Sequence, residues 1–392
     1  MTFMKKEITF QDLLEDRRIC ASLFSHVSAR TLLRLDRLCR LAHSAVGTYM
    51  KATFDVNTLL ARFFSDPLGF RVLQAHTGTL VSGSSALQFF DRTFYPASDL
   101  DLYVYPRHRR EVGRWILDAG YAFSPGRGQD ADFEIAVMRN PQSRGLHYVM
   151  PGVSGILTFY RMHRERRLKV QIIVARRTPM EVILGFHSTC VMNVISFERA
   201  YCIFPLATLE RRVSLLAYSS QGRSTRRVEG LDKYTARGFH MLAYLPLADL
   251  VLPHKLAPFT FGPRWLGDRD TWVIKLDTTH IPPTPPPNPY STARTCDPAV
   301  LCNFFVRYDL TDGAIMELCV LESPVLRYSY VLADNDAIDF LSRALAAKAC
   351  DEQFKVVACQ LEDSSYVDAL LPEMCLGCMR DNLARRSSSL RA

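Results

Sequence analysis

Long apolar runs are missing from this chain of 392 residues, and its cysteines follow no regular pattern. No stretch approaches the roughly 20 uninterrupted apolar residues that a membrane-spanning helix needs, so we expect no membrane partner. The 11 cysteines are scattered and odd in number, which is typical of a reducing compartment. The stretch 1–18 is charged and has no apolar core segment, unlike a signal peptide. These absences predict a cytoplasmic or nuclear protein.

Charge is moderate in amount but uneven in distribution. Charged residues make up 22% of the chain, and 48 Lys and Arg against 40 Asp and Glu give a net charge of +8. Two segments are basic: 161–177, which includes Lys169, and 211–237, which includes Lys233 and Arg237. Basic segments attract polyanions such as a nucleotide triphosphate or a nucleic-acid backbone. A solvated loop face is the alternative for each segment.

Apolar spacing divides the chain into three segments. Residues 1–66 have helical spacing, and Ser28 is placed to cap a helix. That helix is expected to contain Leu32, Leu35, Cys39, Ala42 and Val46. Residues 67–217 alternate between helix and strand patterns, and 218–392 contain further alternating runs with a proline-rich loop at 280–289. We predict an α+β fold with an N-terminal helical segment, a mixed sheet with flanking helices, and a C-terminal α+β region.

Individual elements follow from the same patterns. The predicted strands of the middle segment are 79–82, 99–105, 133–138, 155–161 and 169–175. Its predicted helices are 68–75, 84–92, 109–119 and 178–184. The later strand-like runs are 271–276, 302–309 and 316–321, followed by a predicted helix at 336–347.

The most informative motif joins a turn to a pair of acids. Val81-Ser82-Gly83-Ser84 is followed, fifteen positions after Ser84, by Asp99-Leu100-Asp101-Leu102. Strand side chains alternate between faces, so Asp99 and Asp101 point the same way, with Cα atoms about 6.6 Å apart. Carboxylates are hard oxygen ligands, which Mg²⁺ prefers. The motif therefore predicts a Mg²⁺ site at these two acids.

This motif resembles the hG[GS]…DhDh signature of the nucleotidyltransferase superfamily, which has the polymerase-beta-like fold. The resemblance implies that Gly83, Ser84 and the adjacent Ser85 contact a nucleotide triphosphate. It also implies that Asp99 and Asp101 are catalytic metal ligands. Lys169 is expected to grip the triphosphate. The implied reaction transfers a nucleoside monophosphate to a hydroxyl of RNA, protein or a small molecule.

The family uses a third carboxylate on a later strand beside the first two acids. The matching strand here is expected at 168–173, where Gln171 is the polar residue amid apolar ones. An amide oxygen can coordinate Mg²⁺, but it brings no negative charge and cannot act as a base. We therefore expect Gln171 to occupy the third catalytic position in a partly degenerate site. Glu134, on the predicted strand 133–138, is the alternative third acid.

The N-terminal segment resembles an F-box over Ile19 to Ser28, followed by Leu32-Leu33-Arg34-Leu35 and Cys39-Arg40. This resemblance implies binding to the Skp adaptor of cullin ubiquitin ligases, although Arg17-Arg18 stands where F-boxes begin with Leu-Pro. A helical cap packed on the next domain is the alternative. The combination of both modules is similar to that of uncharacterised fungal proteins.

Three other clusters carry weaker signals. His187 and Cys190 lack an orienting acid beside them, so we interpret 187–193 as a pocket floor rather than a nucleophile. Cys375 and Cys378 have zinc spacing, but a structural zinc needs four ligands and no second such pair exists. A last set is interpreted as packing and turn formation: Trp265, Asp268, Asp270 and Trp272.

Two functions from different classes remain. One is a Mg²⁺-dependent nucleotidyltransferase, favoured by retention of Asp99 and Asp101. The other is a noncatalytic module, favoured by Gln171, that either holds a nucleotide or serves as the substrate receptor of a cullin ubiquitin ligase.

Overall fold

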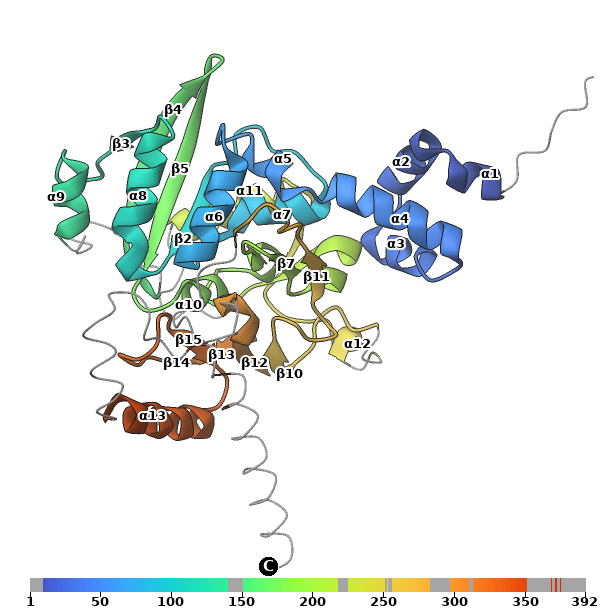
Figure 1. Ribbon diagram of the computed structural model, residues 1–392. Coiled ribbons are helices and arrows are strands. Elements are labelled where there is room, and N and C mark those ends of the chain that lie inside the picture. Colours follow the sequence, from blue (N-terminus) through green and yellow to red (C-terminus); the bar gives the residue numbers. More distant parts are fainter. Residues whose placement is uncertain are drawn as a thin grey trace, which may run out of the picture.

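The computed structural model describes residues 10–139, 151–217, 225–250, 252, 256–282, 297–309, 313–350, 368, 371 and 374. The fold class is α+β, as predicted, with N-terminal helices, an eight-stranded mixed sheet flanked by helices, and smaller sheets toward the C-terminus (Figure 1). Among the described residues, no helix combines the length and apolar character needed to cross a membrane.

The N-terminal helices project to one side of the body (Figure 1). They are α1 (Phe10–Glu15), α2 (Arg17–Ser25), α3 (Ala29–Leu35) and α4 (Arg40–Thr53), followed by the short α5 (Val56–Leu60). Helices α1 to α4 enclose a small core of their own, which includes Phe24, Leu32 and Val46. Arg92 joins this unit to the body, because its guanidinium donates to Phe24 O, Val27 O and Tyr49 Oη.

The predicted Ser28 cap is confirmed, since its hydroxyl accepts a hydrogen bond from Thr31 N at the start of α3. The single helix predicted beyond it is wrong. The chain turns after Leu35, and Cys39 then caps α4 by accepting from Ala42 N. Apolar residues recur every three or four positions on both sides of this turn as well as across it. The pattern therefore did not show that the helix ends at Leu35.

The main sheet has the strand order β11-β7-β6-β1-β2-β5-β4-β3. Its strands are β1 (Leu80–Ser82), β2 (Leu100–Val104), β3 (Ala122–Ser124), β4 (Val153–His163), β5 (Arg166–Ala175), β6 (Asn193–Ile195), β7 (Arg199–Cys202) and β11 (Trp272–Lys275). Only β2 and β5 pair in parallel within this described sheet; its other neighbours are antiparallel. Strand β11 comes from the segment beyond 217, so that segment contributes an edge of the sheet.

The helices that lie before and between the strands along the chain pack against the faces of the sheet. They are α6 (Pro67–Thr77), α7 (Gly83–Asp91), α8 (Arg109–Asp118), α9 (Phe133–Met138), α10 (Pro179–Leu184) and α11 (Thr225–Thr235), with short helices η1 (Pro106–His108), η2 (Thr189–Val191) and η3 (Leu206–Arg211). One sheet face, including Leu102 and Ile172, packs against Phe70 of α6 and Ile116 of α8. The other face includes Tyr103 and carries the acids described below.

The strand predicted at 133–138 is wrong, because these residues form helix α9. Asp132 caps this helix by accepting a hydrogen bond from Ile135 N. Its buried residues, Phe133, Ala136 and Val137, lie at helical rather than alternating spacing. The ring of Phe133 packs against Phe159 of the sheet.

The chain beyond β7 forms smaller elements. These are β8 (Val213–Leu215), β9 (His240–Leu242), α12 (Leu247–Leu250), β10 (Gly262–Trp265), η4 (Pro298–Leu301), β12 (Asn303–Asp309), β13 (Gly313–Glu317), β14 (Cys319–Leu321), β15 (Tyr330–Leu332) and α13 (Asn335–Cys350). The predicted strands at 271–276 and 302–309 and the helix at 336–347 are confirmed, whereas the run 316–321 is divided between β13 and β14. Most of the proline-rich loop, together with Cys375 and Cys378, lies outside the described residues.

Candidate functional site

The turn after β1 brings the backbone of Gly83 against the carboxylate of Asp101. Gly83 begins α7 with φ = +67°, a conformation that glycine adopts without strain. A Cβ at this position would lie 3.3 Å from Asp101 Oδ2. The expected strand, Gly-Ser turn and helix are therefore present. The helix predicted at 84–92 starts one residue earlier, at Gly83, and Ser82 is its N-cap residue.

Asp99 and Asp101 flank Leu100 at the beginning of β2. Ser82 of β1 is the antiparallel partner of Asp101, which fixes the acid beside the Gly-Ser turn. Leu100 and Leu102 are fully buried on the opposite face. Strand alternation therefore places both acids on one face of the sheet, as the sequence predicts.

Across the parallel β2–β5 pair, neither acid faces another acid. Gln171 is the partner of Asp101, which places β5 and Gln171 where the sequence predicts them. Lys169, two positions earlier on β5, forms an ion pair with Asp99, with 2.7 Å between Nζ and Oδ2. Gln171 Nε2 donates to Thr158 Oγ1 at 3.2 Å. The third position of the site is therefore an amide, and one acid already has a cationic partner.

Electrostatics at the site favour a cation. Burial, and next the like charge of Asp99, raise the pKa of Asp101 to about 6, although Lys169 and Lys233 act in the opposite direction. Lys233 reaches the site from α11, and burial lowers the pKa of its ammonium. A divalent cation between the two carboxylates would remove their mutual repulsion.

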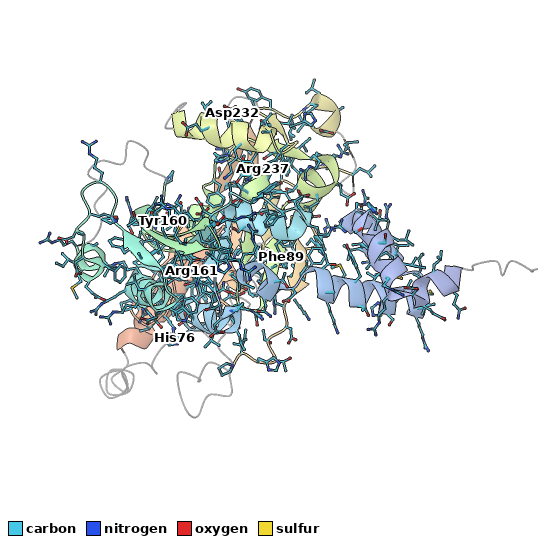
Figure 2. All side chains as sticks on the ribbon, turned by 90° about the horizontal axis from the view of Figure 1, so that it is seen from above. His76, Phe89, Tyr160, Arg161, Asp232 and Arg237 are labelled. Atoms are coloured by element: carbon cyan, nitrogen blue, oxygen red, sulfur yellow. The ribbon has the colours of Figure 1, made fainter. Side chains whose placement is uncertain are left out.

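Arg237 follows α11, the helix that contains Lys233 and Asp232 (Figure 2). Its guanidinium lies 3.8 Å from the centroid of the Tyr95 ring and donates to Ser98 Oγ at 3.4 Å, just before Asp99. Sequence reasoning placed Lys233 and Arg237 in a basic segment without connecting them to the acids. The connection depends on the position of α11 in space, which no local pattern encodes.

The two serines of the turn have different surroundings. The Ser85 hydroxyl is buried and donates to Asp99 O at 2.8 Å, so it ties α7 to the start of β2. The Ser84 side chain is also buried, and its hydroxyl forms no hydrogen bond with the described residues. Ser84 is therefore the serine whose hydroxyl is available for a phosphate contact.

The donor set suits a single Mg²⁺ better than two. Within the described ranges, no group of three or more His, Cys, Asp or Glu side chains is arranged to hold a metal ion. Asp99, Asp101 and the Gln171 amide offer oxygen ligands with two negative charges. Mg²⁺ accepts such a set, since it usually retains several waters and shares its coordination with substrate phosphates.

Glu134 is not the missing third acid, contrary to the alternative prediction. Its carboxylate oxygens accept hydrogen bonds from Nε of Arg110 and Nε of Arg114 on α8, each at 2.6 Å. These hydrogen bonds, that from Arg114 first, lower the pKa of Glu134. The residue lies on α9, which packs over the sheet face that is opposite to the acids.

Cys190 and Asp268 belong to two further predicted clusters, and both have structural contacts. Cys190 is fully buried, and burial raises the pKa of its thiol, which disfavours a nucleophilic thiolate. Its backbone N–H donates to Ser214 Oγ. Asp268 forms a buried ion pair with Arg264 and accepts from the backbone of Asp270. This confirms the interpretation of that region as packing and turn formation.

The basic segment 161–177 is spread over both ends of the β4–β5 hairpin. Arg161 is structural, because it donates to Phe63 O and Ala119 O. Arg167 lies over the Tyr160 ring, and Lys169 contacts Asp99. Figure 2 shows Tyr160 and Arg161 as neighbours in the β4 region. Only part of the predicted basic segment therefore belongs to the acid site.

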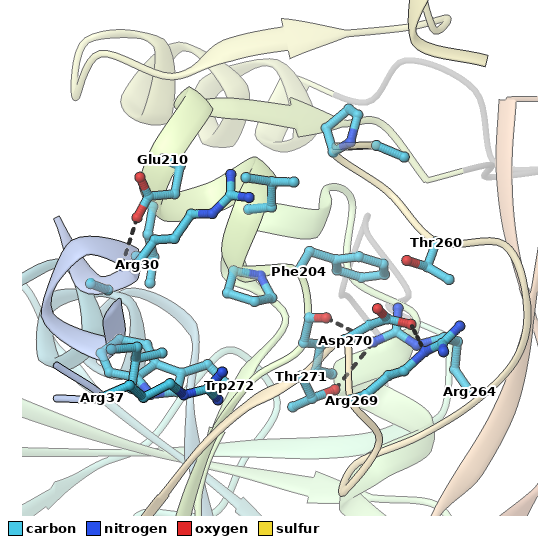
Figure 3. Close-up of a pocket in the computed structure, with 18 residues that line it drawn as sticks. Arg30, Arg37, Phe204, Glu210, Thr260, Arg264, Arg269, Asp270, Thr271 and Trp272 are labelled. Atoms are coloured by element: carbon cyan, nitrogen blue, oxygen red, sulfur yellow. Dashed lines mark hydrogen bonds and ion pairs between the residues drawn. The ribbon is translucent and has the colours of Figure 1, made fainter. Parts of the chain in front are cut away.

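A separate cavity of about 540 Å³ lies where the N-terminal unit meets the body (Figure 3). Arg30 of α3 and Glu210 of η3 line one part of it, and the Arg30 backbone donates to the Glu210 carboxylate. Arg264 and Thr271 line another part and are hydrogen-bonded to each other. Its walls come from segments far apart in the chain, so no sequence motif marked it.

Comparisons of the chain with protein-family models, curated proteins and solved structures found no match.

Proposed function

We propose that this protein binds a nucleoside triphosphate together with Mg²⁺ at Asp99 and Asp101, in the manner of a nucleotidyltransferase-like domain with a partly degenerate metal site. The observation that carries this proposal is the close approach of the Gly83 turn to the Asp101 carboxylate, since a Cβ at position 83 would lie 3.3 Å from Oδ2. A tight turn that opens a helix exposes backbone N–H groups toward an anion. Two carboxylates beside it would hold the cation that accompanies a triphosphate.

The basic side chains around the acids support a phosphate ligand. Lys233 and Arg237 approach from α11, and Lys169 lies on β5. On nucleotide binding, Mg²⁺ would replace Lys169 as the partner of Asp99, and the released ammonium could then contact a phosphate. The Ser84 hydroxyl is available for the same purpose.

We expect the rate of nucleotidyl transfer to an acceptor to be low. In nucleotidyl transfer, an acceptor hydroxyl of RNA, protein or a small molecule attacks the α-phosphorus, and pyrophosphate leaves. The hydroxyl must lose its proton, and Mg²⁺ would stabilise charge on the attacking and leaving oxygens. Gln171 supplies neither a base nor a third negative charge. We therefore propose nucleotide binding as the main activity and transfer as slow.

Calorimetric titration of the purified protein with ATP, GTP, CTP and UTP, with and without Mg²⁺, tests the proposal. We expect at least one nucleotide to bind in the presence of Mg²⁺ and to bind more weakly with EDTA. Absence of binding at millimolar concentration, or binding indifferent to Mg²⁺, would contradict it. Incubation with an α-³²P-labelled nucleotide tests whether label is transferred to an acceptor.

A second proposal concerns the N-terminal unit, which has its own core and exposes apolar side chains. Four of these are between 38% and 63% exposed: Ile19, Leu23, Leu33 and Leu38. We propose that they form the contact with a Skp adaptor, so that the body would serve as the receptor part of a ubiquitin ligase. The wild-type chain should then bind purified adaptor, and Leu23→Glu with Leu38→Glu should abolish binding.

Leu247→Glu is the matched control, since Leu247 is 77% exposed on α12, outside the N-terminal unit. This variant should bind the adaptor like the wild type. Failure of the wild type to bind would leave the exposed leucines without this role.

A further inference from the structure

A second pocket lies beyond the carboxyl end of β2, where the main sheet meets the loop between β14 and β15. It has a volume of about 370 Å³, within the range of small-ligand sites. Arg107 follows β2, Arg176 follows β5, and Arg327 lies in the β14–β15 loop; all three line the pocket. Three chain segments distant in sequence therefore converge on one cavity.

The lining of this pocket is strongly basic. Its charged residues are Arg107, Arg176, Arg177, Arg327 and Glu322, so four positive charges face one negative charge. Arg177 is balanced by an ion pair with Glu181 beside the pocket. Even with this pair set aside, the cations of the lining exceed the acid by two charges.

Two of these arginines are held in place by backbone contacts. Arg107 Nη1 donates to Arg327 O at 3.0 Å, and Arg327 Nη2 donates to His76 O at 2.7 Å. Arg327 Nε is buried and has no hydrogen-bond partner within the described part of the chain. A guanidinium offers five N–H donors, so Arg327 retains a donor beyond its structural hydrogen bonds.

Arg176 differs from the other two, because its side chain contributes to the pocket without supporting the fold. It is exposed, and its guanidinium forms no hydrogen bond, ion pair or ring contact with the residues that the structure describes. Only its backbone is engaged, by donation to Gly152 O. Among the described residues of the lining, the arginines outnumber the single acid, an arrangement that an anionic ligand would stabilise.

We infer that this pocket binds a small anion that carries at least two phosphate groups. Arginine forks match phosphate oxygens in bidentate geometry. One phosphate group would fill only part of the cavity of about 370 Å³. A ligand that bridges them would also fasten the β14–β15 loop to the sheet. This site is independent of the acids at the other end of β2.

Calorimetric titration with tripolyphosphate, in EDTA and without Mg²⁺, tests the inference. We expect binding that weakens as the salt concentration rises, because the contacts are electrostatic. Inorganic monophosphate should bind more weakly. No binding of tripolyphosphate at millimolar concentration would overturn the inference, and equal binding of the two probes would overturn the requirement for more than one phosphate.

Two substitutions with opposite expected effects identify the site. Arg176→Gln should weaken binding about tenfold, as expected for loss of a charge-assisted contact. Glu322→Gln removes the only acid among the described residues of the lining and should strengthen binding. Arg127→Gln is the matched control, because Arg127 is another exposed arginine without a side-chain partner among the described residues.

Equal affinities of the Arg176→Gln and Arg127→Gln variants would overturn the assignment, as would weaker binding by Glu322→Gln. Thermal unfolding should show unchanged stability for all three variants, since none of these side chains supports the core. Lys169→Gln with Lys233→Gln, which removes the two ammonium groups beside the acids, should retain tripolyphosphate binding. Its loss there would show that the probe binds at the acid site, and would overturn the separate pocket while leaving the proposed nucleotide site intact.

Discussion

The two ends of strand β2 present opposite charge along the same face of the sheet. Asp99 and Asp101 stand at its beginning, and Tyr103 and Tyr105 continue the alternation toward the arginine pocket beyond its end. At the acid end, the flanking positions on β5 are Lys169 and Gln171. At the basic end, Arg176 follows the same strand β5 without a balancing acid.

The acid end is a site whose turn and acids are near one another in the sequence, whereas the basic end is made by residues that are far apart in it. The acid end consists of one turn and two adjacent strands, and its charges are already partly satisfied by Lys169. The basic end requires the sheet and the β14–β15 loop to meet, and the arginines of its described lining outnumber the acid. The acid end is therefore expected to bind a cation with a nucleotide, and the basic end to bind an anion alone.

The largest effect is expected from removing the charge of the acid end. Asp99→Asn combined with Asp101→Asn should weaken Mg²⁺-dependent nucleotide binding by about 100-fold or more, because loss of buried charge partners typically removes 2–5 kcal/mol. Calorimetry with the nucleotide that the wild type binds measures this change. Asp118→Asn, at the exposed end of α8, is the control for simple loss of negative charge. An affinity equal to that of this control would exclude the two acids as ligands.

The region behind the basic end contains a different buried carboxylate, Asp297, whose pKa burial raises to about 6. The folded state thus holds this proton more tightly than the unfolded state does. The stabilisation that comes from holding this proton is fully present below about pH 4. It decreases between about pH 4 and pH 6, and above about pH 6 it is lost. Asp297→Asn mimics the protonated acid and should stabilise the protein at pH 7.5 by about 2 kcal/mol.

Denaturant unfolding of this variant at pH 4.5 and pH 7.5 measures the effect. The Asn oxygen can still accept the hydrogen bond that Ala299 N donates to Asp297 Oδ1. The wild type should therefore lose more stability than the variant between the two pH values. If both lost the same amount, Asp297 would not be the group that titrates.

The sequence predicts the acid end of β2 better than the basic end, because the turn and the acids of the acid end are close in the chain. Gly83 and Asp101 lie within one short motif, and the family resemblance together with strand alternation predicts Gln171 beside the two acids. The pairing of Lys169 with Asp99 was missed, because its charge was assigned to a phosphate ligand before the register was known. Helix α9 was mistaken for a strand because apolar residues outnumber polar ones over its six residues. Of the basic pocket, the sequence singled out only the part around Arg176, within the basic segment 161–177. Arg176 meets Arg107 and Arg327 only in the folded chain.

A smaller effect is expected from adding charge to the acid end. Gln171→Glu places a third carboxylate opposite Asp101 and should strengthen Mg²⁺ binding about tenfold, the usual scale of one charge-assisted contact. It should also increase transfer of labelled nucleotide, because it supplies a base. Without Mg²⁺ the variant should unfold at a lower temperature than the wild type, since three carboxylates repel one another. Gln171→Met, of similar length but without an oxygen, is the control, and equal behaviour of the two variants would show that position 171 does not reach the metal.

The smallest effect is expected at Glu134, the acid that lies outside both ends of β2. Glu134→Gln removes the ion pairs with Arg110 and Arg114 at the protein surface, where such pairs contribute little. Mg²⁺-dependent nucleotide binding should be unchanged by calorimetry, because α9 covers the opposite face of the sheet. The two arginines released from Glu134 should also leave tripolyphosphate binding unchanged, since they do not line the basic pocket. A loss of nucleotide binding in this variant would return Glu134 to the metal site and would require α9 to occupy a different position from the one described.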